Sequence, residues 1–218
     1  MKMHVLAFAA ALCAGAAQAA PIDWNTWSST SAGTITTTGG PIGVTYSGPA
    51  LNVYNPYPSY TPTPTFADGV VVNNAPTASN GILQITGGDS SVQTLTFSQA
   101  VVDPVMAIWS LGQGGINASF HFLGSAVPTF VSGGPSAEYG GTPIIVSGQD
   151  VFGREGNGTV QFKGTFTSIS WTNPVYEYWY GFDVGVAGVA TTVPEPETYA
   201  LMLAGLAAVG FVARRRRS

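Results

Sequence analysis

Apolar and polar residues alternate with a period of two through the middle of the chain. The clearest example is residues 116–122, in which every second side chain is apolar. The apolar positions are Ile116, Ala118, Phe120 and Phe122, and the polar positions between them are Asn117, Ser119 and His121. Successive side chains of a β-strand point to opposite faces of its sheet. This segment is therefore predicted to be a strand with one face in a core and the other in solvent.

Similar short segments, rich in Val, Ile, Thr and aromatic residues, recur with turn residues between them. They are residues 34–38, 42–46, 70–72, 82–86, 92–97, 101–111, 127–131, 143–147, 160–163, 166–171 and 176–186. Gly39–Pro41 is a turn signal, and Asn157–Gly158 is typical of a tight hairpin. Residues 54–64 contain four prolines, which cannot donate to a sheet, and are expected to form an extended loop.

Helical periodicity is missing from residues 20–193, where no stretch places apolar residues every three to four positions. The helix formers Lys, Glu, Leu and Ala are scarce in this part of the chain, whereas Gly, Thr, Ser, Val and aromatic residues are abundant. Roughly ten to twelve short strands without a helix favour an all-β domain. We expect residues 20–186 to form an antiparallel β-sandwich, jelly-roll-like in style.

The last predicted strand, residues 176–186, is unusually aromatic. Alternation puts six side chains on one face: Tyr176, Tyr178, Tyr180, Phe182, Val184 and Val186. The other face carries Glu177, Trp179, Gly181, Asp183 and Gly185. An aromatic ring can receive the apolar side of a sugar, so Glu177, Trp179 and Asp183 are candidate sugar contacts, and a second core face is the alternative. The two acids would lie about 20 Å apart along a strand. Glycosidase carboxylates are about 5–9.5 Å apart, so these two cannot be such a pair.

Both ends of the chain are apolar without alternation. Residues 1–19 combine Lys2, an apolar stretch and a small-x-small site that ends at Ala19. This is the pattern of a secretory signal peptide. It would direct export of the chain through the Sec translocon and would then be removed by signal peptidase. We predict cleavage after Ala19, because cleavage after Ala20 would make Pro21 the first residue of the mature protein.

Residues 199–213 form the second apolar stretch, and no charged side chain lies between Glu197 and Arg214. A helix that is apolar on every face is solvated by lipid rather than by water. About sixteen residues at ~1.5 Å each span about 24 Å, slightly less than a hydrocarbon core. We therefore predict a single C-terminal transmembrane helix with a weak insertion free energy of roughly 2–4 kcal/mol.

Charged residues and prolines flank this predicted helix. A membrane stop of four arginines follows it: Arg214, Arg215, Arg216 and Arg217. The positive-inside rule places these arginines in the cytoplasm and the rest of the chain outside. The segment that precedes the helix is Val193, Pro194, Glu195 and Pro196. Each proline fixes φ and biases its predecessor toward extended geometry, so this segment has a shape that a protease can accept.

These three parts, in this order, resemble the PEP-CTERM sorting domain of Gram-negative bacteria, over about the last 26 residues. The resemblance implies cleavage near Pro194–Pro196 by an exosortase, an integral-membrane cysteine protease, usually in bacteria that make exopolysaccharide. An ordinary membrane anchor is the alternative. The predicted organisation is a signal peptide (1–19), a β-sandwich domain (20–186), a linker (187–193) and a sorting signal (194–218).

Removal of both ends changes the charge of the chain. Between residues 20 and 193, only Arg154 and Lys163 oppose nine acidic residues, which gives a net charge of −7. Nucleic-acid binding is disfavoured because it needs a basic surface. The one cysteine, Cys13, lies in the signal peptide, so the mature protein has no disulfide, zinc thiolate or cysteine nucleophile. The acids are scattered singly, and neither a metal nor a cofactor is predicted.

His121 is the only histidine that remains after the signal peptide is removed. A Ser-His-Asp triad would have to use it, with Ser119 on the same face, but no carboxylate is near in sequence to orient the ring. We expect a solvated surface histidine and no catalytic residue.

The chain is therefore predicted to be a non-catalytic, exosortase-processed protein of the cell surface or extracellular matrix, associated with exopolysaccharide. It would be held in the inner membrane until it is cleaved. The first alternative is a carbohydrate-binding module. The second is a hydrolase whose carboxylates come together only in the fold.

Overall fold

The structure is a computed structural model that describes residues 21–187. The predictions for the signal peptide, for Val193–Pro196, for the transmembrane helix and for Arg214–Arg217 lie outside these residues. Within residues 21–187, no helix is both long enough and apolar enough to cross a membrane.

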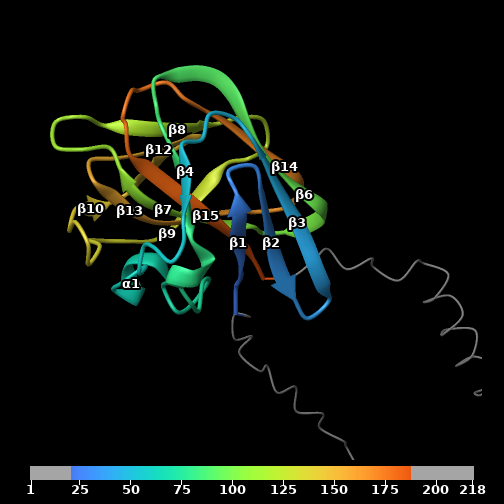
Figure 1. The fold of residues 1–218 in the computed structure, drawn as a ribbon. Helices are drawn as coiled ribbons and strands as arrows, with labels where there is room; N and C mark the ends of the chain where they lie inside the picture. The colour runs from blue at the N-terminus through green and yellow to red at the C-terminus, as the bar shows by residue number, and fades with distance from the viewer. Residues whose placement is uncertain (1–20, 188–218) are drawn as a thin grey trace, which may run out of the picture.

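The described residues form fifteen strands, one short α-helix and one 3₁₀ turn (Figure 1). The strands are β1 (Asp23–Ser29), β2 (Ala32–Thr37), β3 (Gly40–Ser47), β4 (Asn52–Tyr54), β5 (Ile82–Ile85), β6 (Asp89–Val102), β7 (Val105–Leu111), β8 (Ala118–Phe122), β9 (Pro128–Gly133), β10 (Thr142–Pro143), β11 (Ile145–Ser147), β12 (Asp150–Gly153), β13 (Gly156–Phe162), β14 (Thr165–Asn173) and β15 (Tyr180–Val186). The helix is α1 (Thr63–Phe66), and the 3₁₀ turn is η1 (Ala78–Asn80).

All fifteen strands belong to one sheet that is nearly closed into a barrel. The path through the sheet is β10-β13-β7-β15-β1-β2-β3-β6-β14-β8-β12-β11. Its two end strands, β10 and β11, are separated in the chain only by Ile144, so the edges of the sheet meet at that residue. The predicted all-β class and antiparallel pairing are confirmed, with β10–β13 as a parallel exception. The predicted pair of separate sheets is replaced by this one continuous sheet.

Strand β1 connects the two halves of the sheet. Its first residues, Asp23 and Trp24, pair with β15, and the rest of the strand pairs with β2. Figure 1 shows β1, β2 and β3 side by side as a long ribbon on one flank of the molecule. A strand that changes partners along its length lets one sheet turn a corner without breaking its hydrogen bonds.

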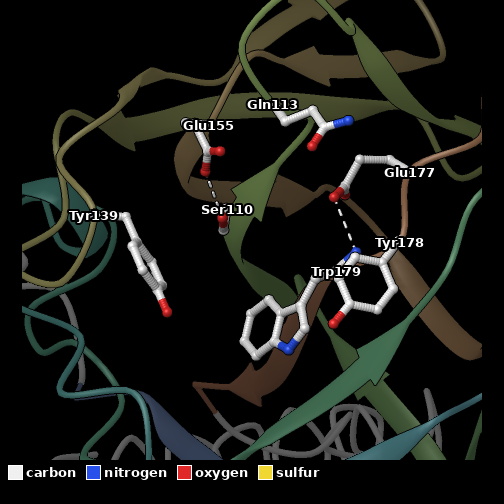
Figure 2. Close-up of a pocket in the computed structure, with 7 residues that line it drawn as sticks. All are labelled: Ser110, Gln113, Tyr139, Glu155, Glu177, Tyr178 and Trp179. Atoms are coloured by element: carbon white, nitrogen blue, oxygen red, sulfur yellow. Dashed lines mark hydrogen bonds between the residues drawn. The ribbon is translucent and has the colours of Figure 1, made fainter.

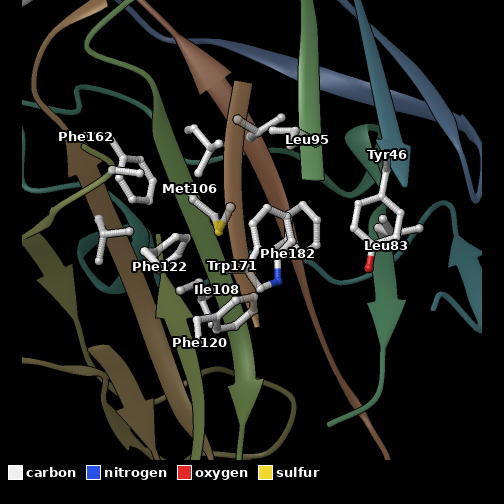
Figure 3. Packing of buried hydrophobic residues seen from close by; sticks show 14 of the residues in the cluster. Tyr46, Leu83, Leu95, Met106, Ile108, Phe120, Phe122, Phe162, Trp171 and Phe182 are labelled. Carbon is white, nitrogen blue, oxygen red and sulfur yellow. The ribbon is translucent and has the colours of Figure 1, made fainter. Parts of the chain in front are cut away.

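The interior of the barrel is filled by aliphatic and aromatic side chains (Figure 3). Trp171 from β14 meets Phe182 from β15 edge to face, with ring centroids 5.3 Å apart. Phe120 and Phe122 from β8 are also fully buried, whereas His121 between them is partly exposed. The predicted alternation in residues 116–122 is therefore confirmed over β8.

A second apolar cluster lies on the outer face of β7 and β15. Alternate residues of β7 supply both clusters: Met106 and Ile108 face the interior, while Ala107 and Trp109 face outward. The loop between β4 and β5, which contains α1, covers this outer face with side chains such as Phe66. Burial on both faces explains why residues 105–111 are apolar at every position except Ser110.

Three local predictions are wrong. Residues 70–72 are not a strand, because the Asp68 carboxylate accepts hydrogen bonds from all three of their backbone N–H groups and holds them in a turn. Asn157–Gly158 is not a hairpin turn but lies within β13, which pairs with β7 and β9. Tyr176 and Tyr178 do not extend β15: they are 64% and 63% exposed, and the strand begins at Tyr180.

Candidate functional site

A pocket of about 350 Å³ opens where the end of β7 meets two loops and the segment before β15. Its lining residues come from four separate parts of the chain (Figure 2). They are Ser110, Gln113, Tyr139, Glu155, Glu177, Tyr178 and Trp179. Figure 2 shows the two carboxyl groups directed toward the open centre, with the rings of Tyr139 and Trp179 on the other side.

Glu155 lies in the turn between β12 and β13, which is held against the end of β7. Its backbone N–H donates to the Gly112 carbonyl at 3.1 Å, and its Oε2 accepts a hydrogen bond from Ser110 Oγ at 2.6 Å. Gly112 has φ +77°, and a Cβ there would lie 2.1 Å from the carbonyl oxygen of Gly153. Only glycine permits both this conformation and this close approach, which bring the Glu155 carboxylate to the pocket.

Asn157 connects, through its side chain, three segments that line the pocket. Its side chain is 1% exposed, and its Oδ1 accepts the backbone N–H of Ser110 at 2.9 Å. Its Nδ2 donates to the carbonyl oxygens of Gly140 and Glu155, at 3.1 and 3.0 Å. One buried amide therefore fixes β7, the loop that carries Tyr139 and the turn that carries Glu155.

Glu177 lies in the segment before β15, and its carbonyl oxygen accepts the backbone N–H of Gly87 at 2.8 Å. The residue is 3% exposed. Its Oε1 accepts the backbone N–H of Trp179 at 2.9 Å, and its Oε2 has no hydrogen-bond partner among the described residues. Burial raises the pKa of Glu177 to about 7, the Trp179 N–H opposes this shift, and the negative charge of Glu155 adds to it.

Five aromatic side chains form a continuous cluster along the pocket and beneath it: Tyr54, Tyr57, Trp109, Tyr139 and Trp179. Trp109 is fully buried at the centre, with ring centroids 5.0 Å from Trp179 and 5.3 Å from Tyr139. Trp179 is partly exposed and Tyr139 is exposed, so these two rings present surface to the pocket. Trp109 supports them from behind.

Positive charge is missing from this pocket. Among residues 21–187, neither Glu155 nor Glu177 forms a salt bridge, and the one that is present joins His121 to Asp150. Arg154, next to Glu155 in sequence, lines a different hollow with Asn117 and Phe152. The pocket therefore holds two acidic side chains with no cation to neutralise them.

The structure brings two of the three candidate sugar contacts together. Glu177 and Trp179 line the same pocket, but Asp183 does not reach it. Asp183 is 0% exposed within β15, and its Oδ1 accepts a 3.4 Å hydrogen bond from Asn25 Nδ2. Burial raises the pKa of Asp183 well above its ordinary value. A carboxyl group enclosed in this way has no contact with a ligand that arrives from solvent.

The residues on the other side of the pocket are not predicted from the sequence. Ser110, Gln113, Tyr139 and Glu155 come from segments that were interpreted as a strand end, loops and a hairpin tip. A usable signal was present in residues 153–158, where three glycines surround Glu155 and Asn157. Glycines at this density permit close backbone approach, and here they bring a polar segment against β7.

His121 has a partner that its sequence neighbours do not suggest. Strands β8 and β12 pair His121 with Asp150, and the two side chains meet at 2.7 Å between Nδ1 and Oδ1. The histidine lies at the surface, with both side chains about two-fifths exposed, but a carboxylate that is distant in sequence contacts its ring. A serine nucleophile would have to contact this ring, and no hydroxyl does so within the described residues.

No group of three or more His, Cys, Asp or Glu side chains in the described part of the chain is placed to hold a metal ion. The pocket with its two acids therefore offers carboxylate oxygens, a hydroxyl, an amide and aromatic faces as its binding groups. Such a set suits hydroxyl- and amine-bearing ligands with an apolar face.

The fold and this pocket define an all-β domain with an acidic, aromatic pocket. Comparison with protein families adds the sorting signal: the model of the PEP-CTERM protein-sorting motif matches residues 192–217. This match confirms the resemblance drawn from Pro194–Pro196 and Arg214–Arg217, and it indicates a surface protein targeted by an exosortase. No curated protein and no solved structure matches the chain.

Proposed function

We propose that this protein is exported, cleaved by an exosortase at Pro194–Pro196 and left at the cell surface or in the extracellular matrix as a non-catalytic component associated with exopolysaccharide. The observation that carries this proposal is the sorting motif at residues 192–217. The acidic charge of residues 20–193 and the absence of cysteine from them are compatible with an exported β domain.

The proposal is tested by following the chain in cells with and without an exosortase. Full-length protein should lose its C-terminal segment only in the exosortase-containing cells, as intact-mass measurement of the product reports. A variant with Pro194→Ala and Pro196→Ala should stay uncleaved in the membrane fraction. A matched control, Pro174→Ala in the β domain, should be processed like the unaltered chain. Normal cleavage and release of the double variant would contradict the proposal.

A second candidate function is carbohydrate binding by the pocket. The observation that favours it is the pair of rings, Trp179 and Tyr139, that face the same 350 Å³ pocket as two carboxylates. Sugar rings stack their C–H faces on aromatic side chains, while carboxylates accept hydrogen bonds from their hydroxyl groups. Retarded migration of the protein in gels that contain a polysaccharide, and loss of the retardation in Trp179→Ala, would support this function. Unretarded migration with every polysaccharide would contradict it.

A further inference from the structure

The pocket contains two carboxyl groups, although a neutral sugar needs no negative charge for its recognition. Glu155 already accepts a hydrogen bond from Ser110 Oγ, and Glu177 accepts one from the Trp179 N–H. Among residues 21–187, no basic side chain lines the pocket. Two carboxylates that face one pocket repel each other, and a bound cation removes this repulsion.

One oxygen of this pair lacks a partner. Glu177 Oε2 belongs to a side chain that is 3% exposed, and within residues 21–187 it accepts no hydrogen bond. An unpaired buried acceptor costs free energy that a donor from a ligand can recover. An N–H⁺ donor recovers more than an O–H donor, because charge-assisted hydrogen bonds are roughly twice as strong as neutral ones.

The remaining wall is aromatic, and it favours a ligand with an apolar face. Trp179 and Tyr139 both contact the buried Trp109, with ring centroids 5.0 and 5.3 Å from it. This support from behind holds the two rings in place before a ligand arrives. Aromatic faces attract cations as well as the C–H face of a sugar ring, so both properties of the pocket suit one kind of ligand.

We propose that this pocket binds an amino sugar, with the sugar ring against Trp179 and Tyr139 and its protonated amine between Glu155 and Glu177. This inference rests on the carbohydrate-binding function proposed above and names its ligand class. A deacetylated hexosamine within a polysaccharide has the required chemistry. Asn157 is a positioning residue, because it holds the segments that carry Ser110, Glu155 and Tyr139 without lining the pocket itself.

Binding should depend on pH. The ionisable groups that face Glu177 are Glu155, Tyr139 and Tyr178 in the pocket and Tyr180 at the start of β15. The pKa of Glu177 is about 7, so this group gains its negative charge as the pH rises through 7. The affinity for an amino sugar should therefore pass through a maximum near neutral pH, because Glu177 is protonated at lower pH and the weakly basic sugar amine loses its proton at higher pH.

Three tetrasaccharides separate the amine from the sugar: β-1,4-linked glucosamine, the same sugar fully N-acetylated, and β-1,4-linked glucose. Binding is measured by calorimetry with the full-length protein in a detergent that has no sugar headgroup. The glucosamine tetramer should bind at least about tenfold more tightly than the other two, because neither of them carries an amine charge. Equal affinity for the glucosamine and N-acetylglucosamine tetramers would overturn the inference.

Two variants assign the interaction to its residues. Glu177→Gln keeps the shape of the side chain but removes its charge, and it should weaken glucosamine binding about 30-fold or more. Asp150→Asn, at the opposite end of β12 from the Glu155 turn, removes one negative charge outside the pocket and should leave the affinity unchanged. An equal loss in both variants would mean that only net charge matters and would overturn the proposed site.

The outcomes also separate this inference from the function on which it rests. Binding of the glucose tetramer as tight as that of glucosamine would leave carbohydrate binding intact and overturn the amine. Binding of none of the three would overturn both. A trilysine peptide that binds as tightly as glucosamine would show an amine site without sugar recognition and overturn the amino-sugar assignment. Cleavage of the bound tetramer, detected by mass spectrometry, would contradict a pure binding role.

Discussion

Two buried carboxyl groups lie six residues apart in the chain, in very different surroundings. Asp183 is enclosed within β15, where its Oδ1 accepts a long hydrogen bond from Asn25 Nδ2. Glu177 is almost equally buried but lies before the strand, where its carboxyl group faces a 350 Å³ pocket. Burial is the largest cause of the raised pKa of both groups. Only Glu177 can exchange its unfavourable surroundings for contacts with a ligand.

This difference teaches that burial of an acid does not by itself identify a site. An enclosed acid such as Asp183 has a raised pKa, and no ligand from solvent can reach it to stabilise its charge. A buried acid that opens on a pocket keeps a free-energy cost that binding can offset. Natural sites commonly retain such costs, and removing them stabilises the fold at the expense of function.

The largest expected effect on stability comes from replacing a tryptophan in the enclosed core, compared with replacing one in the pocket. Trp171 is 0% exposed and packs against Phe120 and Phe182, so Trp171→Ala should lower the free energy of unfolding by about 3–5 kcal/mol. Trp179→Ala removes a partly exposed ring and should cost about 1–2 kcal/mol. Urea unfolding of the exported protein followed by circular dichroism measures both. Equal costs would show that the pocket wall is part of the core.

The second prediction concerns Asp183 itself. Its pKa in the folded protein is raised, so between its unfolded value and its folded value the native state binds a proton that the unfolded state has lost. This group is therefore most stabilising at acid pH, and its contribution is lost as the pH rises. Asp183→Asn should reduce the fall in stability between pH 5 and pH 8, and Asn25 Oδ1, which has no hydrogen-bond partner in the described structure, can accept from the new amide. An unchanged pH dependence would mean that Asp183 is charged.

Glu177→Gln should have a smaller effect of the same sign. The pKa of Glu177 is raised to about 7, so its stabilising contribution is present below about pH 4.5 and is lost as the pH rises to 7. At pH 8, the variant should be more stable than the unaltered protein by about 1–2 kcal/mol, allowing for solvent in the pocket. At pH 4, the two should unfold at nearly the same urea concentration. If Glu177→Gln were less stable than the unaltered protein at pH 8, the ionised Glu177 carboxylate would not be destabilising.

The smallest effect is expected at an acid outside both regions. Asp150 pairs with His121 at 2.7 Å, and both side chains are about two-fifths exposed. Exposed ion pairs contribute about 0–1 kcal/mol, so Asp150→Asn should change the free energy of unfolding by less than about 1 kcal/mol. The effect should shrink further in concentrated salt. A loss as large as that in Trp171→Ala would mean that the pair has a structural role beyond its charge.

The sequence predicted strands most reliably where apolar residues alternate with other residues, so that one face of the strand packs in the core. In β8, Phe120 and Phe122 alternate with His121, and in β15 the set from Tyr180 to Val186 follows the predicted faces. The predictions fail where side chains, rather than periodicity, determine the backbone. Asp68 turns an apolar Val-Val-Val segment by accepting three N–H groups, and no alternation pattern contains that information.

Only one side of the candidate site, Glu177 and Trp179, could be predicted from the sequence, because contacts between distant segments form the other side. Glu177 and Trp179 lie two residues apart in the chain, so a local pattern indicates both of them. Glu155 and Ser110 meet through a contact over 45 residues, which depends on the β7–β13 register and on the buried amide of Asn157. An Asn-Gly pair normally indicates a turn, and here tertiary hydrogen bonds hold it in a strand. Closure of the sheet at Ile144 is likewise a property of the whole path of strands.

The most direct test measures the protons released when the glucosamine tetramer binds at pH 5.5. At this pH most of the sugar amine is protonated, and Glu177, with a pKa of about 7, still holds its proton. A cation bound at this carboxylate lowers its pKa, so roughly half a proton or more should be released for each ligand. Calorimetry in two buffers of different ionisation enthalpy measures this number, which should fall to near zero in Glu177→Gln. Binding without proton release, or equal release from the variant, would contradict the account.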